Sequence, residues 1–103
     1  MDKQELKDFF IQLGWQVDHM GNMRFTSVRV NAVTGFKLER KLRIKFQSKS
    51  VRVEVQVHHP DAEHSYAKNE WVRIGGQYYS KITRDGNVVR IGTYVFTLNA
   101  GAA

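Results

Sequence analysis

The first 14 residues have the hydrophobic spacing of an amphipathic helix. Asp2 precedes this segment and Glu5 follows three positions later, which is the arrangement of a capping box. Gly14 is suited to the left-handed conformation that ends many helices. A helix of this length is marginal alone, so we expect it to pack on a sheet. Its apolar stripe, at intervals of three and four residues, comprises Leu6, Phe9, Phe10 and Leu13.

After Gly14, apolar and polar residues alternate as they do in β-strands that are buried on one side. The alternation changes phase near Thr26–Ser27, which predicts a β-bulge there. Asp85-Gly86 between alternating segments predicts a hairpin, and Gly92 predicts a bend in the last strand. The segments 36–46 and 51–57 are expected to form a second hairpin. The predicted strands cover residues 15–19, 23–32, 36–46, 51–57, 71–74, 77–83 and 88–98.

One helix followed by six or seven antiparallel strands predicts an α+β fold, with the helix on the apolar face of a twisted sheet. The expected bulge, Gly92 and the Gly75-Gly76 pair would also permit a curled, partly open barrel. We expect a single α+β domain over residues 1–98 and a frayed C-terminal tail over residues 99–103.

The segment 36–46, FKLERKLRIKF, separates into two contrasting faces. Phe36, Leu38, Leu42, Ile44 and Phe46 share one parity, interrupted by Arg40, and are expected to face the core. The opposite parity is almost entirely basic. Residues 36–57 hold seven basic and two acidic residues, so most of the net charge of +6 lies in this part of the chain.

This basic parity favours a nucleic-acid-binding module. Side chains two apart on a strand are about 6.6 Å apart, a pitch at which cations can follow a phosphate backbone, whether of DNA or of RNA. Exposed tyrosines could add base stacking, although no RNA-recognition or helix-turn-helix motif is present. The predicted nucleic-acid-binding residues are Lys37, Lys41, Arg43, Lys45 and Arg52, extended by Arg73, Arg84 and Arg90.

Two alternatives stay open. The same face could be a solvated surface that binds nothing, because lysines also keep sheets soluble. The chain could instead be a protein-interaction module, such as an accessory or inhibitor subunit of the kind that mobile elements encode, docked on an acidic surface of a larger partner. A homodimer through a strand edge is a further option. The candidate contact residues are His58, His59, His64, Trp71, Tyr78 and Tyr79.

Other function classes find little support. The absence of cysteine excludes disulfides and thiolate zinc sites. The segment HHPDAEH, residues 58–64, matches no zinc signature and is expected to be a polar loop. No GxSxG or phosphate-binding loop occurs, so we expect neither an enzyme nor a cofactor. With no signal segment and no long apolar run, we expect a cytoplasmic protein that does not enter the membrane.

Overall fold

A computed structural model of the chain describes residues 1–58 and 69–98. The predicted helix is confirmed as α1, Lys3–Gln12. The Asp2 carboxylate accepts a hydrogen bond of 2.8 Å from the Glu5 backbone N–H, as a capping residue does. Gly14 has a φ of +91° and turns the chain away from the helix.

The large sheet contains five antiparallel strands in sequence order, each hydrogen-bonded to the next. The predicted hairpin of residues 36–46 and 51–57 is confirmed as the pair β3–β4. The strands are β1 (Gln16–Val17), β2 (Met23–Val30), β3 (Lys37–Phe46), β4 (Ser50–His58) and β5 (Asn69–Tyr78).

The C-terminal part forms a separate sheet of three antiparallel strands, so the class α+β is confirmed and the expectation of one sheet of six or seven strands is not. After β5 the chain leaves the large sheet through a short 3₁₀ helix, η2 (Tyr79–Lys81). The Asp85-Gly86 hairpin is confirmed as β6 (Arg84–Asp85) with β7 (Val88–Ile91). Gly92, with a φ of +60°, then reverses the chain into β8 (Tyr94–Thr97), which makes the expected last strand a hairpin.

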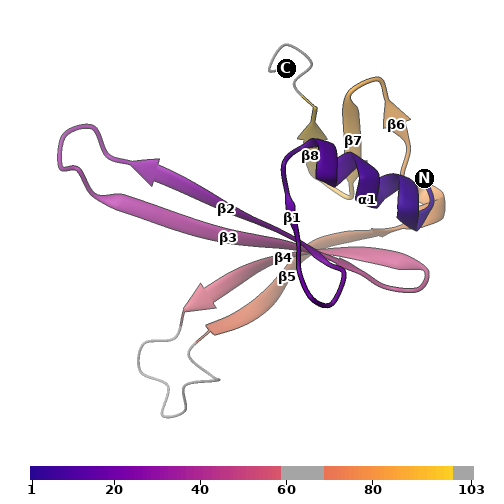
Figure 1. Ribbon diagram of the computed structural model, residues 1–103, viewed down its shortest axis with the longest axis horizontal. Helices are drawn as coiled ribbons and strands as arrows, with labels where there is room; N and C mark the ends of the chain where they lie inside the picture. Colours follow the sequence, from indigo (N-terminus) through magenta and orange to yellow (C-terminus); the bar gives the residue numbers. More distant parts are fainter. Residues whose placement is uncertain (59–68, 99–103) are drawn as a thin grey trace.

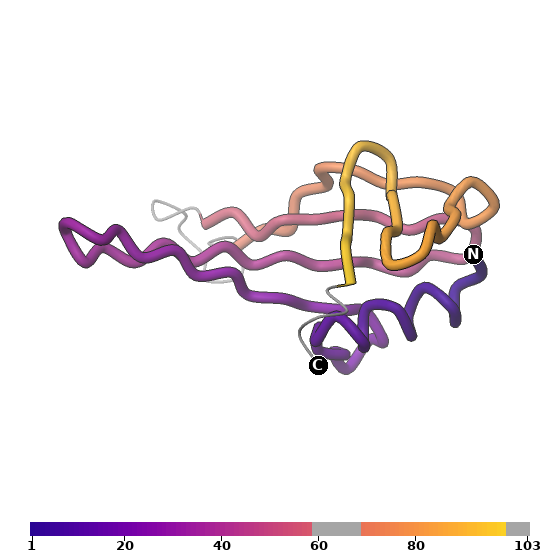
Figure 2. The backbone as a smooth tube through the Cα atoms, turned by 90° about the horizontal axis from the view of Figure 1, so that it is seen from above, coloured from indigo at the N-terminus to yellow at the C-terminus, as the bar shows by residue number. Residues whose placement is uncertain are grey.

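Helix α1 and the small sheet lie on the same side of the large sheet (Figures 1 and 2). We call the covered side the apolar face and the other side the polar face. The ring of Phe10 from α1 meets Phe96 from β8 edge to face at 5.0 Å, so the two covering elements also contact one another. The buried core comprises Leu6, Phe9, Phe10, Trp15, Met23, Ile44, Val51, Val53, Tyr79, Ile82, Val89 and Ile91.

The predicted bulge near Thr26–Ser27 is wrong, because β2 and β3 keep one register from Met23↔Ile44 to Val30↔Lys37. The phase change in the sequence arises because Val28 and Val30 are on the polar face, outside the core. The sheet is irregular instead between β4 and β5, where the register shifts between Val53 and Glu54.

The Gly75-Gly76 pair lies inside β5 and does not separate two strands. Gly75 is opposite Val53 on the apolar face. A Cβ at Gly75 would lie 2.7 Å from two ring atoms of Tyr94, so only glycine leaves room for this ring from β8. The missing side chain therefore lets the small sheet approach the large one closely.

The hairpin β2–β3 extends beyond the elements that cover the apolar face (Figures 1 and 2). We call its projecting part, residues 26–41, the arm. The sequence predicts that Phe36 and Leu38 face the core, and this is wrong: they are 67% and 59% exposed. Leu38 has the same parity as buried Ile44, but neither α1 nor the small sheet reaches this far.

Candidate nucleic-acid interface

The register places most of the predicted cationic residues on the polar face. Lys41, Arg43 and Lys45 share one parity of β3, opposite to that of buried Ile44. Across the strands, Lys45 is opposite Arg52, and Glu54 is opposite both Arg43 and Arg73. Lys37 has the same parity but lies out on the arm. Six of the eight predicted residues are therefore on one side of the large sheet: Lys37, Lys41, Arg43, Lys45, Arg52 and Arg73.

Arg84 and Arg90 are not brought to this face. Both belong to the small sheet, which packs on the apolar side. The Arg84 guanidinium lies 5.3 Å from the ring centroid of Phe9 in the core, and its Nε donates to the Gly86 carbonyl at 2.7 Å. Arg90 is exposed between buried Val89 and Ile91, so it points away from the large sheet. The thickness of the sheet separates both residues from the polar face.

Trp71 is the aromatic residue at one end of this cationic surface. It is half-buried and opposite Gln56 on the polar face. The Arg43 guanidinium lies 4.6 Å from its ring centroid and that of Arg24 lies 5.4 Å away, both within cation–π range. Sequence reasoning missed Arg24, although the burial of Met23 implies that its neighbour points to the opposite face.

A buried ion pair fixes the position of Arg43. Its guanidinium Nη2 lies 2.7 Å from Glu54 Oε1, and its Nε donates to the same oxygen at 2.8 Å. The Glu54 side chain is 5% exposed and that of Arg43 is 16% exposed. Arg43 is therefore largely neutralised and serves mainly to position Trp71 and to compensate a buried carboxylate.

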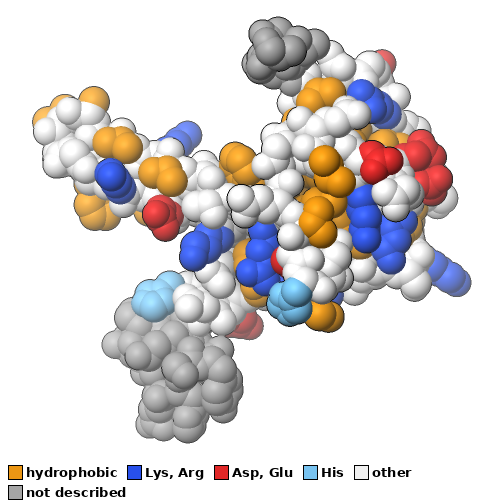
Figure 3. Space-filling view, in the orientation of Figure 1, with side chains coloured by type: hydrophobic (Ala, Val, Ile, Leu, Met, Phe, Trp, Pro, Cys, Tyr) orange, Lys and Arg blue, Asp and Glu red, His pale blue; other side chains and the backbone are white. Residues whose placement is uncertain are grey.

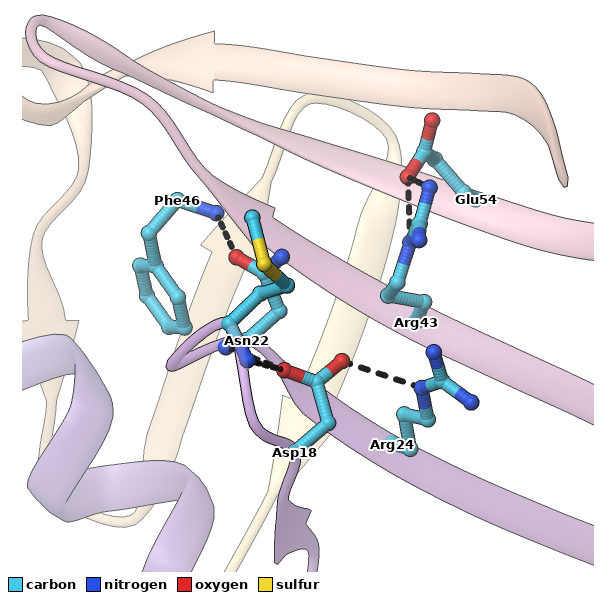
Figure 4. A network of polar contacts seen from close by, with 7 residues as sticks. Asp18, Asn22, Arg24, Arg43, Phe46 and Glu54 are labelled. Carbon is cyan, nitrogen blue, oxygen red and sulfur yellow. Dashed lines mark hydrogen bonds and ion pairs between the residues drawn. The ribbon is translucent and has the colours of Figure 1, made fainter.

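A second network holds Arg24 (Figure 4). Its Nε lies 3.0 Å from Asp18 Oδ2, while Asp18 Oδ1 accepts from the backbone N–H groups of Met20 and Asn22. Burial by itself raises the pKa of Asp18, but these hydrogen bonds and the Arg24 charge outweigh it and lower the pKa. The Asn22 side chain accepts from the Phe46 N–H at 3.0 Å, which ties the β1–β2 turn to β3.

Two concavities lie along the polar face. The larger, of about 380 Å³, is lined by Trp71 together with the side chains of Arg24, Lys41, Gln16 and Gln56, and also by Gly14, Phe25, Thr26 and Leu42. The second, of about 220 Å³, is lined by Tyr78, Arg52 and Arg73, and also by Gln47, Ser50, Val51, Gly76 and Gln77. Each concavity thus combines an aromatic residue of the polar face, Trp71 or Tyr78, with two cationic residues.

Besides Lys37, four cations of this face have no ion pair with any residue in 1–58 or 69–98: Lys41, Lys45, Arg52 and Arg73. They are distributed over three adjacent strands, between the two aromatic residues. Because Trp71 and Tyr78 stand seven positions apart on β5, the surface between them spans about 20 Å. Such an arrangement can hold several phosphates and offer a ring at each end.

The residues expected to contact a protein partner are separated. Tyr78 is 58% exposed on the polar face, whereas Tyr79 is buried in the core and its hydroxyl donates to the Gln47 carbonyl at 2.7 Å. His58 ends β4, with Nδ1 3.0 Å from the side-chain oxygen of Asn69. His59 and His64 lie outside the described residues.

Residues 1–58 and 69–98 contain no group of three or more His, Cys, Asp or Glu side chains that could hold a metal ion. Within the same residues, α1 is too short and too polar to cross a membrane. Comparison of the chain with protein-family models, with curated proteins and with solved structures finds no match.

Proposed function

We propose that the protein binds nucleic acid through the polar face of its large sheet, and that it prefers single strands to duplexes. The observation that carries this proposal is that each concavity combines an aromatic ring, Trp71 or Tyr78, with at least one cation that has no ion pair among the described residues. Protein surfaces that bind single strands use positive side chains along the backbone and aromatic rings on which bases stack. The bases of a duplex are already stacked on one another and cannot use such rings.

The phosphates would be bound by Lys41, Lys45, Arg52 and Arg73, which have no carboxylate partner among the described residues. Four such contacts to a single strand predict that affinity falls about 50-fold between about 50 and 200 mM salt. Trp71 and Tyr78 would stack bases, and each stacked base contributes about 1–3 kcal/mol. Recognition would rest on charge and shape, with little readout of base identity.

The first test measures the fluorescence anisotropy of labelled single-stranded RNA, single-stranded DNA and duplex DNA at both salt concentrations. The test variant is Lys41→Glu/Lys45→Glu, because neither residue is opposite Glu54 and changing them leaves the buried pair of Arg43 intact. The matched control is Lys81→Glu/Arg90→Glu, which changes the net charge equally but on exposed residues of η2 and β7, outside the large sheet.

We expect the test variant to lose binding and the control to retain most of it. Equal losses in both variants would show that only net charge matters, and absence of binding by the wild type at about 50 mM salt would refute the proposal. The exposed ring is tested separately by Tyr78→Ala, which we expect to weaken single-strand binding roughly tenfold and to leave duplex binding unchanged.

A further inference from the structure

The arm exposes an unusual number of apolar side chains for its size (Figure 3). Val28 and Val30 are 51% and 59% exposed on its polar side. Exposed Phe36 and Leu38 occupy the other side. Monomeric proteins seldom leave such a surface uncovered, and larger apolar patches usually mark interaction sites.

The arm also has a strand edge without a neighbour. Strand β1 pairs only with Met23 and Arg24, so residues 25–30 of β2 are paired only with β3 among the described residues. At the end of the arm, the Asn31 N–H donates to the Phe36 carbonyl at 2.8 Å. The backbone N–H and C=O groups of successive residues alternate in direction along an antiparallel strand. Because the Asn31 N–H points to the β3 side, the N–H and C=O groups of the odd-numbered residues of β2 do so as well. The N–H and C=O groups of Thr26, Val28 and Val30 therefore point outward.

The charges on the two edges of the arm differ. Along β3, four of the five residues 37–41 are charged. If a second copy of β3 paired antiparallel with this edge, centred on Glu39, the two Glu39 side chains would face each other. Lys37 of each copy would then face Lys41 of the other. Along β2, residues 25–30 contain a single charge, Arg29. Charged side chains are a usual means of blocking an edge, so the β3 edge is protected and the β2 edge is open.

We propose that a second copy of this chain pairs with the open edge of β2, antiparallel and centred on Val28. This register places Val28 opposite the partner's Val28 and Thr26 opposite the partner's Val30. It also sets the only charge of the edge, Arg29, opposite the partner's Ser27, so no like charges meet. The outward N–H and C=O groups of Thr26, Val28 and Val30 on each copy then form three hydrogen-bonded residue pairs across the interface.

The resulting four-stranded ribbon has a two-fold axis perpendicular to it. The polar faces of both copies therefore lie on the same side, and the exposed valines of the two arms are brought together. The dimer is independent of the proposed nucleic-acid binding, because it rests on the open edge of β2 and not on the cations of β3, β4 and β5.

The proposal is tested by sedimentation velocity over about 1–500 µM protein, a range over which mass action reveals a micromolar dimer. Val28→Pro removes one outward N–H and should raise the dissociation constant at least tenfold. Glu39→Pro is the matched control, because Glu39 is directly opposite Val28 and its N–H points to the other edge of the same arm. We expect the control to dimerise as the wild type does.

Far-ultraviolet circular dichroism and thermal melting establish that both proline variants are folded. If Val28→Pro does not fold, Val28→Lys replaces it, since two lysines would then meet at the centre of the interface and should have the same effect. A wild type that stays monomeric throughout the range would overturn the proposal, as would equal dimerisation of the Val28 and Glu39 variants.

Discussion

The buried ion pair between Arg43 and Glu54 provides the sharpest test of how the polar face is held together. The perturbation is truncation of each partner to alanine, alone and together. At 2.7 Å the two charges attract by about 6 kcal/mol at an effective dielectric constant of about 20, but loss of hydration offsets much of this. The informative quantity is therefore the difference between the single and the double variants.

The exposed fractions of the two side chains set the expected order of the stability losses. Removing Arg43 leaves the Glu54 carboxylate unpaired although its side chain is only 5% exposed. We expect a loss of about 3 kcal/mol in the free energy of unfolding. This is the lower end of the usual range, because Arg73 is also opposite Glu54. Removing Glu54 leaves a guanidinium that keeps the Trp71 ring and more water, so we expect a loss of about 2 kcal/mol. The double variant should lose about 3 kcal/mol, a coupling energy of about 2 kcal/mol.

Urea denaturation at neutral pH, followed by tryptophan fluorescence and circular dichroism, gives the four free energies. Lys41→Ala is the matched control, because this exposed cation on the same strand should change stability by less than about 0.5 kcal/mol. If the two single losses add to the double loss within about 0.5 kcal/mol, the pair is not coupled and the reasoning is wrong.

Two further predictions concern stability. Gly75→Ala should cost about 1–3 kcal/mol in urea denaturation because its Cβ would meet the Tyr94 ring at 2.7 Å; the cost should shrink in a Tyr94→Ala background, and an undiminished cost would contradict this cause. Since the fold lowers the pKa of Asp18 from 3.8, its contribution is complete well above that value and is lost as the pH falls through the folded-state pKa. The free energy of unfolding of Asp18→Asn should therefore be lower than that of the wild type at pH 7, and this difference should shrink below about pH 4. A difference in stability that does not depend on pH would contradict the lowered pKa of Asp18.

The local elements could be predicted because short-range chemistry specifies them. The spacing of Leu6, Phe9 and Phe10, with Asp2 before them and Gly14 after them, is enough to place α1. The hairpins follow in the same way from turn residues between alternating segments. The two faces of β3 follow from the period of two of any strand, and Lys41, Arg43 and Lys45 are on one of them as predicted.

The composition of the candidate interface was only partly predictable. Six of eight cations were placed on one side by register, but Arg84 and Arg90 were not, because the chain leaves the large sheet at η2 and forms a separate sheet. The contacts of Arg24 and Arg43 with the Trp71 ring join β2 and β3 to β5, and no local pattern records contacts between residues so far apart in the sequence.

What the sequence by itself determined is therefore the type of each element and the parity of its residues, since both follow from a few neighbouring positions. What only the tertiary structure decided is where the core ends. Phe36 and Leu38 have the spacing of core residues, yet they are exposed because α1 and the small sheet cover only the inner part of β3. Burial requires a second layer, and the extent of that layer is set by the length and packing of other elements.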